Sequence, residues 1–151
     1  MLASRRGFEE TRVLDLYAGS GALGFEALSR GARFALFVER DAVARDCIAA
    51  NADNLGVAND VRISADEVIS YLRSGAAATG GGERFDIVFA DPPYGIGVES
   101  LPELVAPILN AGGFLVVEHD PSTSFDERDD LITTRRFGRT LVSLFGAGPE
   151  D

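Results

Sequence analysis

Short apolar runs alternate along the chain with segments whose apolar residues recur at helical spacing. The strand-like runs cover residues 13–18, 34–39, 61–64, 85–90 and 113–118. The helical segments cover about residues 22–30, 42–55 and 65–72, and a further one that starts near 100 and is shortened by Pro107. Strands that alternate with helices predict an α/β fold with a doubly wound, mostly parallel sheet.

The end of the chain has a different pattern. Residues 132–137 and 140–145 are two strand-like runs around a short turn, so they predict a closing hairpin with one antiparallel strand. Residues 75–83 lack periodicity and predict a loop, and residues 146–151 are expected to fray. With residues 1–12 as a short N-terminal extension, the 151 residues predict one domain.

Two pairs of residues have the spacing of a helix capping box. They are Ser64 with Glu67, and Ser100 with Glu103. Gly31 is placed to end the first helix. The inner face of the helix over residues 42–55 is predicted to consist of Val43, Cys47, Ile48 and Leu55.

Composition restricts the class of protein. The chain has 24 acidic residues against 14 bases, all of them arginine, and its net charge of −10 opposes unaided binding of RNA or DNA. Its single cysteine excludes an internal disulfide, and Cys47 is expected in the core. No run is long enough to cross a bilayer and no signal peptide precedes the first strand, so we expect a cytoplasmic protein without membrane contact.

A glycine turn follows the first strand. Residues 19–24 read Gly-Ser-Gly-Ala-Leu-Gly, in which glycine permits tight backbone geometry and close approach of a ligand to the helix start. Glu39 ends the second strand and is placed to accept hydrogen bonds from ribose hydroxyls. A dinucleotide site has the same features, but Asp15 would repel a pyrophosphate and suits an ammonium or sulfonium ligand. Asp66 is predicted either to bind an adenine amino group or to stabilise a helix N-terminus.

Residues 91–94 read Asp-Pro-Pro-Tyr and leave the carboxyl end of the fourth strand, where open α/β sheets bind ligands. The carboxylate of Asp91 and the carbonyl of Pro92 can accept from both hydrogens of an exocyclic amino group. Tyr94 offers a ring on which a base can stack. With the glycine turn, this segment predicts transfer of a methyl group from S-adenosylmethionine to an amino nitrogen.

Other polar residues are less specific. His119 has no companion ligand, so we expect a polar strand-end residue and no metal site. Arg135, Arg136 and Arg139 are predicted either to contact RNA phosphates or to offset the acids at 126–130.

Three stretches carry a resemblance to a known family. They are DLYAGSGALGFEALSRGA at 15–32, FVERD at 37–41 and FADPPY at 89–94. The chain resembles, from about residue 13 to 145, the bacterial 16S rRNA guanine-N2 methyltransferases (RsmD-like). This implies a Rossmann-like class I methyltransferase fold with a seven-stranded sheet, and transfer from S-adenosylmethionine to guanine N2. The segment before residue 13 lacks the basic element that the family carries there.

The resemblance and the two motifs together give a set of expected site residues. The cofactor set is Asp15, Tyr17, Gly19, Ser20, Gly21, Glu39, Arg40, Asp66 and Glu67. The catalytic set is Asp91, Pro92, Pro93 and Tyr94. The expected partner is ribosomal RNA in a partly assembled small subunit, with weak binding to naked RNA and a monomer favoured. Alternatives are an enzyme for DNA adenine or protein glutamine, a truncated cofactor-binding remnant without activity and, more distantly, a dinucleotide-dependent oxidoreductase.

Overall fold

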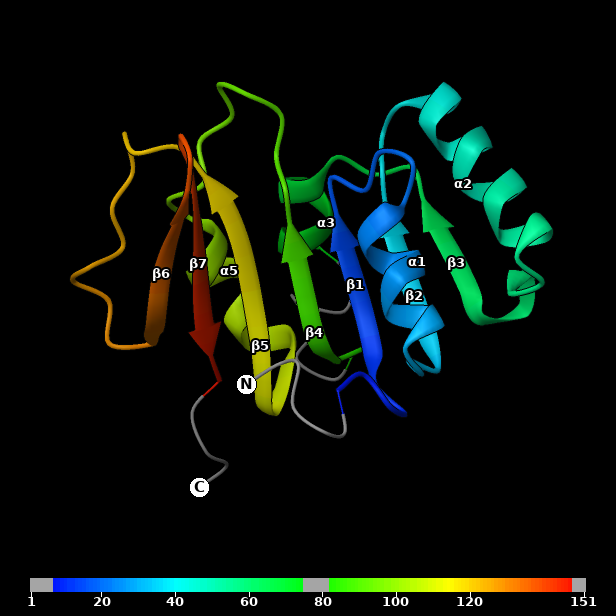
Figure 1. Cartoon of the computed structure of the whole chain (residues 1–151), viewed down its shortest axis with the longest axis horizontal. Coiled ribbons are helices and arrows are strands. Elements are labelled where there is room, and N and C mark those ends of the chain that lie inside the picture. The colour runs from blue at the N-terminus through cyan, green and yellow to red at the C-terminus, as the bar shows by residue number, and fades with distance from the viewer. Residues whose placement is uncertain (1–6, 75–81, 148–151) are drawn as a thin grey trace.

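The computed structural model describes residues 7–74 and 82–147, and within them seven strands form one sheet in the order β3-β2-β1-β4-β5-β7-β6 (Figure 1). The strands are β1 (Arg12–Leu16), β2 (Phe34–Val38), β3 (Val61–Ser64), β4 (Phe85–Ala90), β5 (Leu109–His119), β6 (Leu131–Phe137) and β7 (Thr140–Gly146). The helices are α1 (Ala22–Ser29), α2 (Ala42–Asn54), α3 (Val68–Arg73) and α5 (Leu101–Val105), with 3₁₀ turns η1 (Ala58–Asp60) and η2 (Ala106–Ile108). This arrangement confirms the predicted α/β fold and its seven-stranded sheet.

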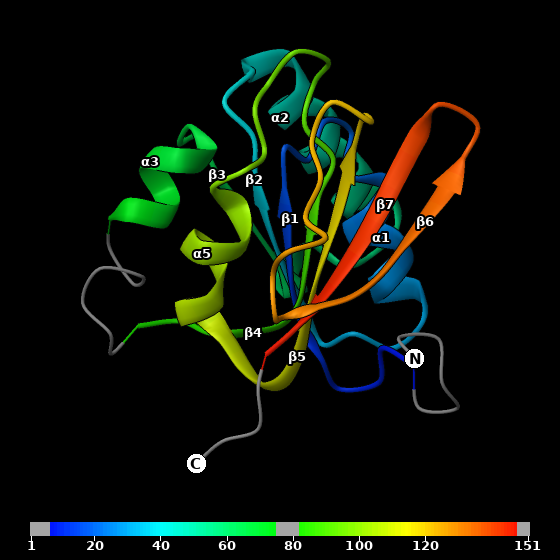
Figure 2. The ribbon, with the colours of Figure 1, turned by 90° about the vertical axis from the view of Figure 1, so that its left-hand side faces the viewer.

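Helices cover both faces of the sheet. Figures 1 and 2 show α1 and α2 on one face, and α3 and α5 on the other. Successive residues of a strand point to opposite faces, so Val13 packs in the core under α1 and α2 while Leu14 packs in the core under α3 and α5. The near-continuous apolar runs in the sequence therefore reflect strands that are buried on both sides.

The closing hairpin also has the predicted form. Strand β7 pairs antiparallel with both β5 and β6, while the pairs among β1 to β5 are parallel. In Figure 1 the arrows of β1, β4 and β5 point up and that of β7 points down. Pro107 shortens its helix as expected, because α5 ends at Val105 and continues only as a 3₁₀ turn. Along the described parts of the chain, no helix has both the length and the apolar character to cross a membrane.

Several local predictions were wrong. Strand β1 ends at Leu16, because Tyr17 adopts a left-handed φ of 58° that takes the chain out of the sheet. Strand β5 starts four residues early, at Leu109. The tail does not fray from residue 146, because the N–H of Gly146 donates to Asp130 O and that of Ala147 to Gly113 O. Residues 148–151, like most of the predicted loop at 75–83, lie outside the described residues.

Both capping boxes were also wrong. Helix α3 is capped by Glu67, whose carboxylate accepts from the N–H groups of Ile69 and Ser70. Ser100 precedes α5 but its side chain makes no capping hydrogen bond. The inner face of α2 is formed by Ile48 and Ala52, whereas Val43, Cys47 and Leu55 are exposed. The expected core cysteine therefore lies at the surface.

Candidate active site

The parallel strands end together at one edge of the sheet. Leu16 is paired with Val38 on one side and with Ala90 on the other. Val38 is paired in turn with Ser64, and Ala90 with Val117. Tyr17, Glu39 and Asp91 directly follow β1, β2 and β4 at this edge. Asp66 lies two residues beyond β3, and Glu118 is the penultimate residue of β5. The strand order reverses between β1 and β4, which is where open α/β sheets bind ligands.

The glycine turn connects this edge to α1. Gly19 and Gly21 have φ values of 59° and 88°, which a residue with a side chain rarely adopts. A Cβ on Gly24, the last glycine of the motif, would lie 2.3 Å from the ring of Phe37. Glycine at position 24 therefore allows α1 to pack closely against β2, and it is a structural residue that the expected cofactor set omitted.

Glu39 ties the glycine turn to the next strand. One carboxylate oxygen accepts from the N–H of Gly19 at 2.8 Å, and the other accepts from the N–H of Asp41 at 2.9 Å. Each carboxylate oxygen has a second lone pair, so Glu39 retains acceptors for two hydroxyl groups. The backbone thus fixes this carboxylate before any ligand binds.

Asp15 lies beneath the turn. It is 2% exposed, and its carboxylate accepts from the N–H of Gly24 at 3.0 Å. Burial raises the pKa of Asp15 to about 7; the bond from Gly24 opposes this rise, and the charges of Asp91 and Glu39 add to it. Asp15 does not line the adjacent cavity.

A cavity of about 490 Å³ opens between the glycine turn and the Asp-Pro-Pro segment. From the expected cofactor set, the residues that line it are Tyr17, Gly19, Glu39, Arg40, Asp66 and Glu67, and Asp91, Pro92 and Pro93 close its other side. Ser20 and Gly21, like Asp15, do not line it. Hydrogen bonds from Ile69 and Ser70 lower the pKa of Glu67, which therefore carries a fixed negative charge at the rim. Asp66 accepts from the hydroxyl of Ser64 and does not cap the helix.

A second cavity, of about 860 Å³, lies on the far side of the same segment. It shares Asp91, Pro92, Pro93 and Ile96 with the first cavity. Tyr94 lines only the second cavity and is 97% exposed, so its ring is free to stack on an incoming group. Another cavity, of about 690 Å³, lies near Arg84 and Asn110, where β4 and β5 begin. It is therefore at the amino-terminal edge of the sheet, away from the other two cavities.

Glu118 is a residue of the second cavity that the sequence analysis did not select. It follows Val117, the partner of Ala90, and stands beside Asp91. The adjacent carboxyl group of Asp91 and partial burial raise the pKa of Glu118 to about 7. The position of Glu118 at the end of an apolar run was the available signal, but its pairing with Asp91 depends on the register of β4 and β5.

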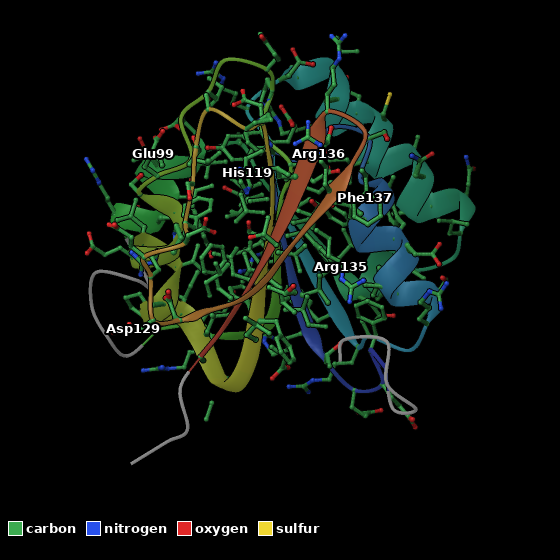
Figure 3. The ribbon with its side chains drawn as sticks, turned by 60° about the vertical axis from the view of Figure 1, so that its left-hand side comes forward. Glu99, His119, Asp129, Arg135, Arg136 and Phe137 are labelled. Atoms are coloured by element: carbon green, nitrogen blue, oxygen red, sulfur yellow. The ribbon has the colours of Figure 1, made fainter. Side chains whose placement is uncertain are left out.

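His119 is the last residue of β5 and is buried beside the hairpin of β6 and β7. Its Nε2 atom lies 2.7 Å from the hydroxyl of Ser143, which is 2.8 Å from that of Thr134, so a hydrogen-bonded chain links β5, β7 and β6. Figure 3 labels His119 to the left of the hairpin that carries Arg135 and Arg136. The ion pairs found among the described residues do not include these two arginines or Arg139, and Asp130 pairs with Arg128.

The sheet order and the paired cavities at its carboxyl edge define the class I methyltransferases with a Rossmann-like fold. The chain belongs to the family described as Conserved hypothetical protein 95, which matches residues 1–146.

Individual relatives agree with this family. A Bacillus subtilis protein named "Putative rRNA methyltransferase YlbH" is 35% identical over 146 residues, which cover 91% of this chain and 77% of that protein. Ribosomal RNA small subunit methyltransferase D of Escherichia coli is 35% identical over 109 residues. That match covers 72% of this chain, and the chain spans about half of that relative, 50% of its length.

Solved structures share the fold. "Putative methyltransferase yhhF" from Escherichia coli has a TM-score of 0.80 and 26% identity, covering 99% of this chain and 82% of that one. An RNA methyltransferase from Salinibacter ruber in complex with S-adenosyl-L-homocysteine has a TM-score of 0.69. It is 17% identical, covers 95% of this chain and 86% of that one, and at this identity shows the fold alone.

Proposed function

We propose that this chain transfers a methyl group from S-adenosylmethionine to the N2 amino group of a guanine in small-subunit ribosomal RNA. One observation carries the proposal: two cavities meet at the Asp91–Pro93 segment, one beside the glycine turn and one beside Tyr94. A cofactor in the first cavity and a base in the second would meet where amino-group acceptors are available.

The residues of the first cavity fit a nucleoside that carries a positively charged sulfonium. Glu39 has free lone pairs for two ribose hydroxyls, and Asp66 is an exposed acceptor for an adenine amino group. The charges of Asp15 and Glu67 favour a cationic ligand. When bound there, S-adenosylmethionine would supply an electrophilic methyl group.

The second cavity supplies orientation. The lone pair of an exocyclic amino nitrogen is delocalised into the ring, which makes the nitrogen a poor nucleophile. Acceptors at Asp91 and the Pro92 carbonyl would hold its two N–H groups and favour a pyramidal geometry, while Tyr94 stacks on the base. The methylated nitrogen is strongly acidic, so its proton needs only a weak acceptor, and Asp91 is adjacent.

The substrate is proposed from the names of the relatives and from charge. Relatives are named as rRNA methyltransferases, one of them for the small subunit. A net charge of −10 repels phosphates, so binding of naked RNA is expected at about 10⁻⁴ M or weaker at physiological salt. Basic ribosomal proteins on a partly assembled subunit would offset this repulsion, and the target guanine must be unpaired to reach Tyr94.

The test uses labelled S-adenosylmethionine with naked 16S RNA, with partly assembled small subunits and with large-subunit RNA. We expect label on the small-subunit particles, and mass spectrometry of the digested RNA should identify N2-methylguanosine. Label on adenine, or on duplex DNA in a parallel reaction, would show that guanine in ribosomal RNA is not the substrate. Calorimetric binding of S-adenosylhomocysteine without methylation of any substrate would favour a cofactor-binding remnant.

A further inference from the structure

Asp91 and Glu118 form a carboxyl pair at the ends of adjacent strands. They directly follow Ala90 and Val117, which are register partners in the parallel pair β4–β5. Neighbouring strands lie about 4.8 Å apart, so the next residues on each strand, Asp91 and Glu118, stand side by side. Both residues line the second cavity, whose position is already set by the Asp91–Tyr94 segment.

Among the described residues, the hydrogen bonds include no backbone donor to the side chain of Asp91 or Glu118. The adjacent carboxyl group of Asp91, together with partial burial, raises the pKa of Glu118 to about 7. The other titratable or charged side chains that line this cavity are Tyr94, Glu99, His119, Asp120 and Arg139. Of these, Glu99 accepts from Thr123, Asp120 accepts from Ser122, and His119 is bound to Ser143. A ligand with two adjacent N–H donors would satisfy Asp91 and Glu118 with both carboxyl groups ionised.

The purine bases differ in this property. Guanine presents its N1–H next to its N2 amino group, so two donors lie side by side on its Watson–Crick edge. Adenine presents an acceptor, N1, next to its N6 amino group. Two ionised carboxylates match guanine, whereas adenine needs a protonated carboxyl group beside the acceptor that holds its amino group.

We propose that Glu118 accepts a hydrogen bond from N1–H of the target guanine while Asp91 holds the N2 amino group, so that the carboxyl pair selects guanine. This inference rests on the proposed function. It adds a residue that determines the base, because a partly buried acceptor left facing another acceptor disfavours the wrong ligand.

The sharpest probe is 2-aminopurine, which keeps the N2 amino group but has an acceptor at N1 and no O6. Short single-stranded RNAs that contain one guanine or one 2-aminopurine in a pyrimidine sequence would be methylated by the full chain at high RNA concentration. Glu118→Gln replaces the acceptor with an amide that can donate to N1. The matched control is Glu99→Gln, which makes the same charge change in the same cavity.

The wild-type chain should methylate guanine about 10- to 100-fold faster than 2-aminopurine in kcat/KM, as expected for one mismatched hydrogen bond. Glu118→Gln should lower this ratio at least about tenfold, while Glu99→Gln leaves it unchanged. The loss of O6 affects every variant alike, so the change in the ratio isolates position 118.

A pH series gives a second readout. With Glu118 protonated below pH 7, the wild-type ratio should fall towards that of Glu118→Gln, and above pH 7 it should rise to a plateau. Titration of Asp15 would change both rates together and leave the ratio unaffected. Binding to the chain saturated with S-adenosylhomocysteine can be followed without turnover from 2-aminopurine fluorescence, with guanosine monophosphate as competitor.

The outcomes separate the two claims. N2-methylation of guanine with the same guanine to 2-aminopurine ratio in wild type and Glu118→Gln would overturn the role of Glu118 and leave the proposed function standing. Binding of S-adenosylhomocysteine without methylation of either base, and without competition by guanosine monophosphate, would overturn both. A ratio that falls in Glu118→Gln but not in Glu99→Gln would support the inference.

Discussion

The two halves of the sheet edge hold their carboxylates in different ways. Beside the glycine turn, Glu39, Asp15 and Glu67 all accept hydrogen bonds from backbone N–H groups. Beside Tyr94, Asp91 and Glu118 stand side by side, and the proximity of Asp91 raises the pKa of Glu118. Backbone donors are fixed by the fold, so the first set is preorganised, whereas the second set can accept donors from a ligand.

This difference matches what each half is proposed to bind. A small cofactor gains affinity when its contacts are already in place. A target base arrives on a macromolecule, and its own N–H groups complete the second set. Substitutions in the substrate half should therefore change catalysis most, and substitutions in the cofactor half should change binding and stability.

The largest effect is expected from Asp91→Ala. Loss of the acceptor should lower methyl transfer by about 10²–10³-fold, because orientation of the amino group is lost at the transition state. Affinity for S-adenosylhomocysteine should stay within a few-fold, as measured by calorimetry. Equal activity in the variant and the wild type would mean that residues 91–94 form only a turn.

Asp15→Asn should stabilise the ligand-free chain. Because the pKa of Asp15 is raised from 3.8 to about 7, the folded state binds the proton more tightly, and the free energy of unfolding falls as pH rises from about 4 to 7. Asparagine removes this loss and still accepts from Gly24, so the variant should gain up to about 4 kcal/mol at pH 8 and little at pH 4. Urea unfolding at both pH values measures the gain, and an equal change at both would contradict the buried-charge explanation.

Glu39→Ala should weaken binding of S-adenosylhomocysteine by about 1–3 kcal/mol, since two ribose hydrogen bonds and the bond from Gly19 are lost. Glu26→Ala is the control, because Glu26 pairs with Arg30 on exposed α1 side chains and its removal should leave affinity unchanged. Preference of the wild-type chain for NAD over the sulfur ligand would reject the cofactor assignment.

Tyr94→Ala should have the smallest effect, about 1–2 kcal/mol in kcat/KM from lost stacking. Tyr94→Phe keeps the ring and should stay within about twofold of wild type, and cofactor affinity should change in neither. An equal loss in both variants would instead assign the role to the hydroxyl group.

The strands, and the site residues that directly follow them, were predictable because both depend on local sequence. Each apolar run up to Ala90 is a strand, and Glu39 and Asp91 follow their strands directly. The inner face of α2 was not predictable, because this alanine-rich helix packs through Ile48 and Ala52 and leaves the larger Val43 exposed.

Long-range geometry accounts for most of what was missed. The pairing of Asp91 with Glu118 requires the register of β4 and β5, which shifts between Phe85 and Ile87. Helix α3 is capped by Glu67 and not by Ser64, because Ser64 is still part of β3 and the helix begins only at Val68. The roles of the nine cofactor residues and four catalytic residues remain predictions.

Within the described residues, strand β6 ends the sheet, and its outer row of backbone groups has no strand beside it. Such an edge invites pairing with other chains, and natural proteins discourage it with charged side chains. Arg135 and Arg136 stand on this edge next to exposed Phe137, and Arg139 follows in the turn (Figure 3). In a chain of net charge −10 these cations are locally concentrated, so they would protect the edge from self-association.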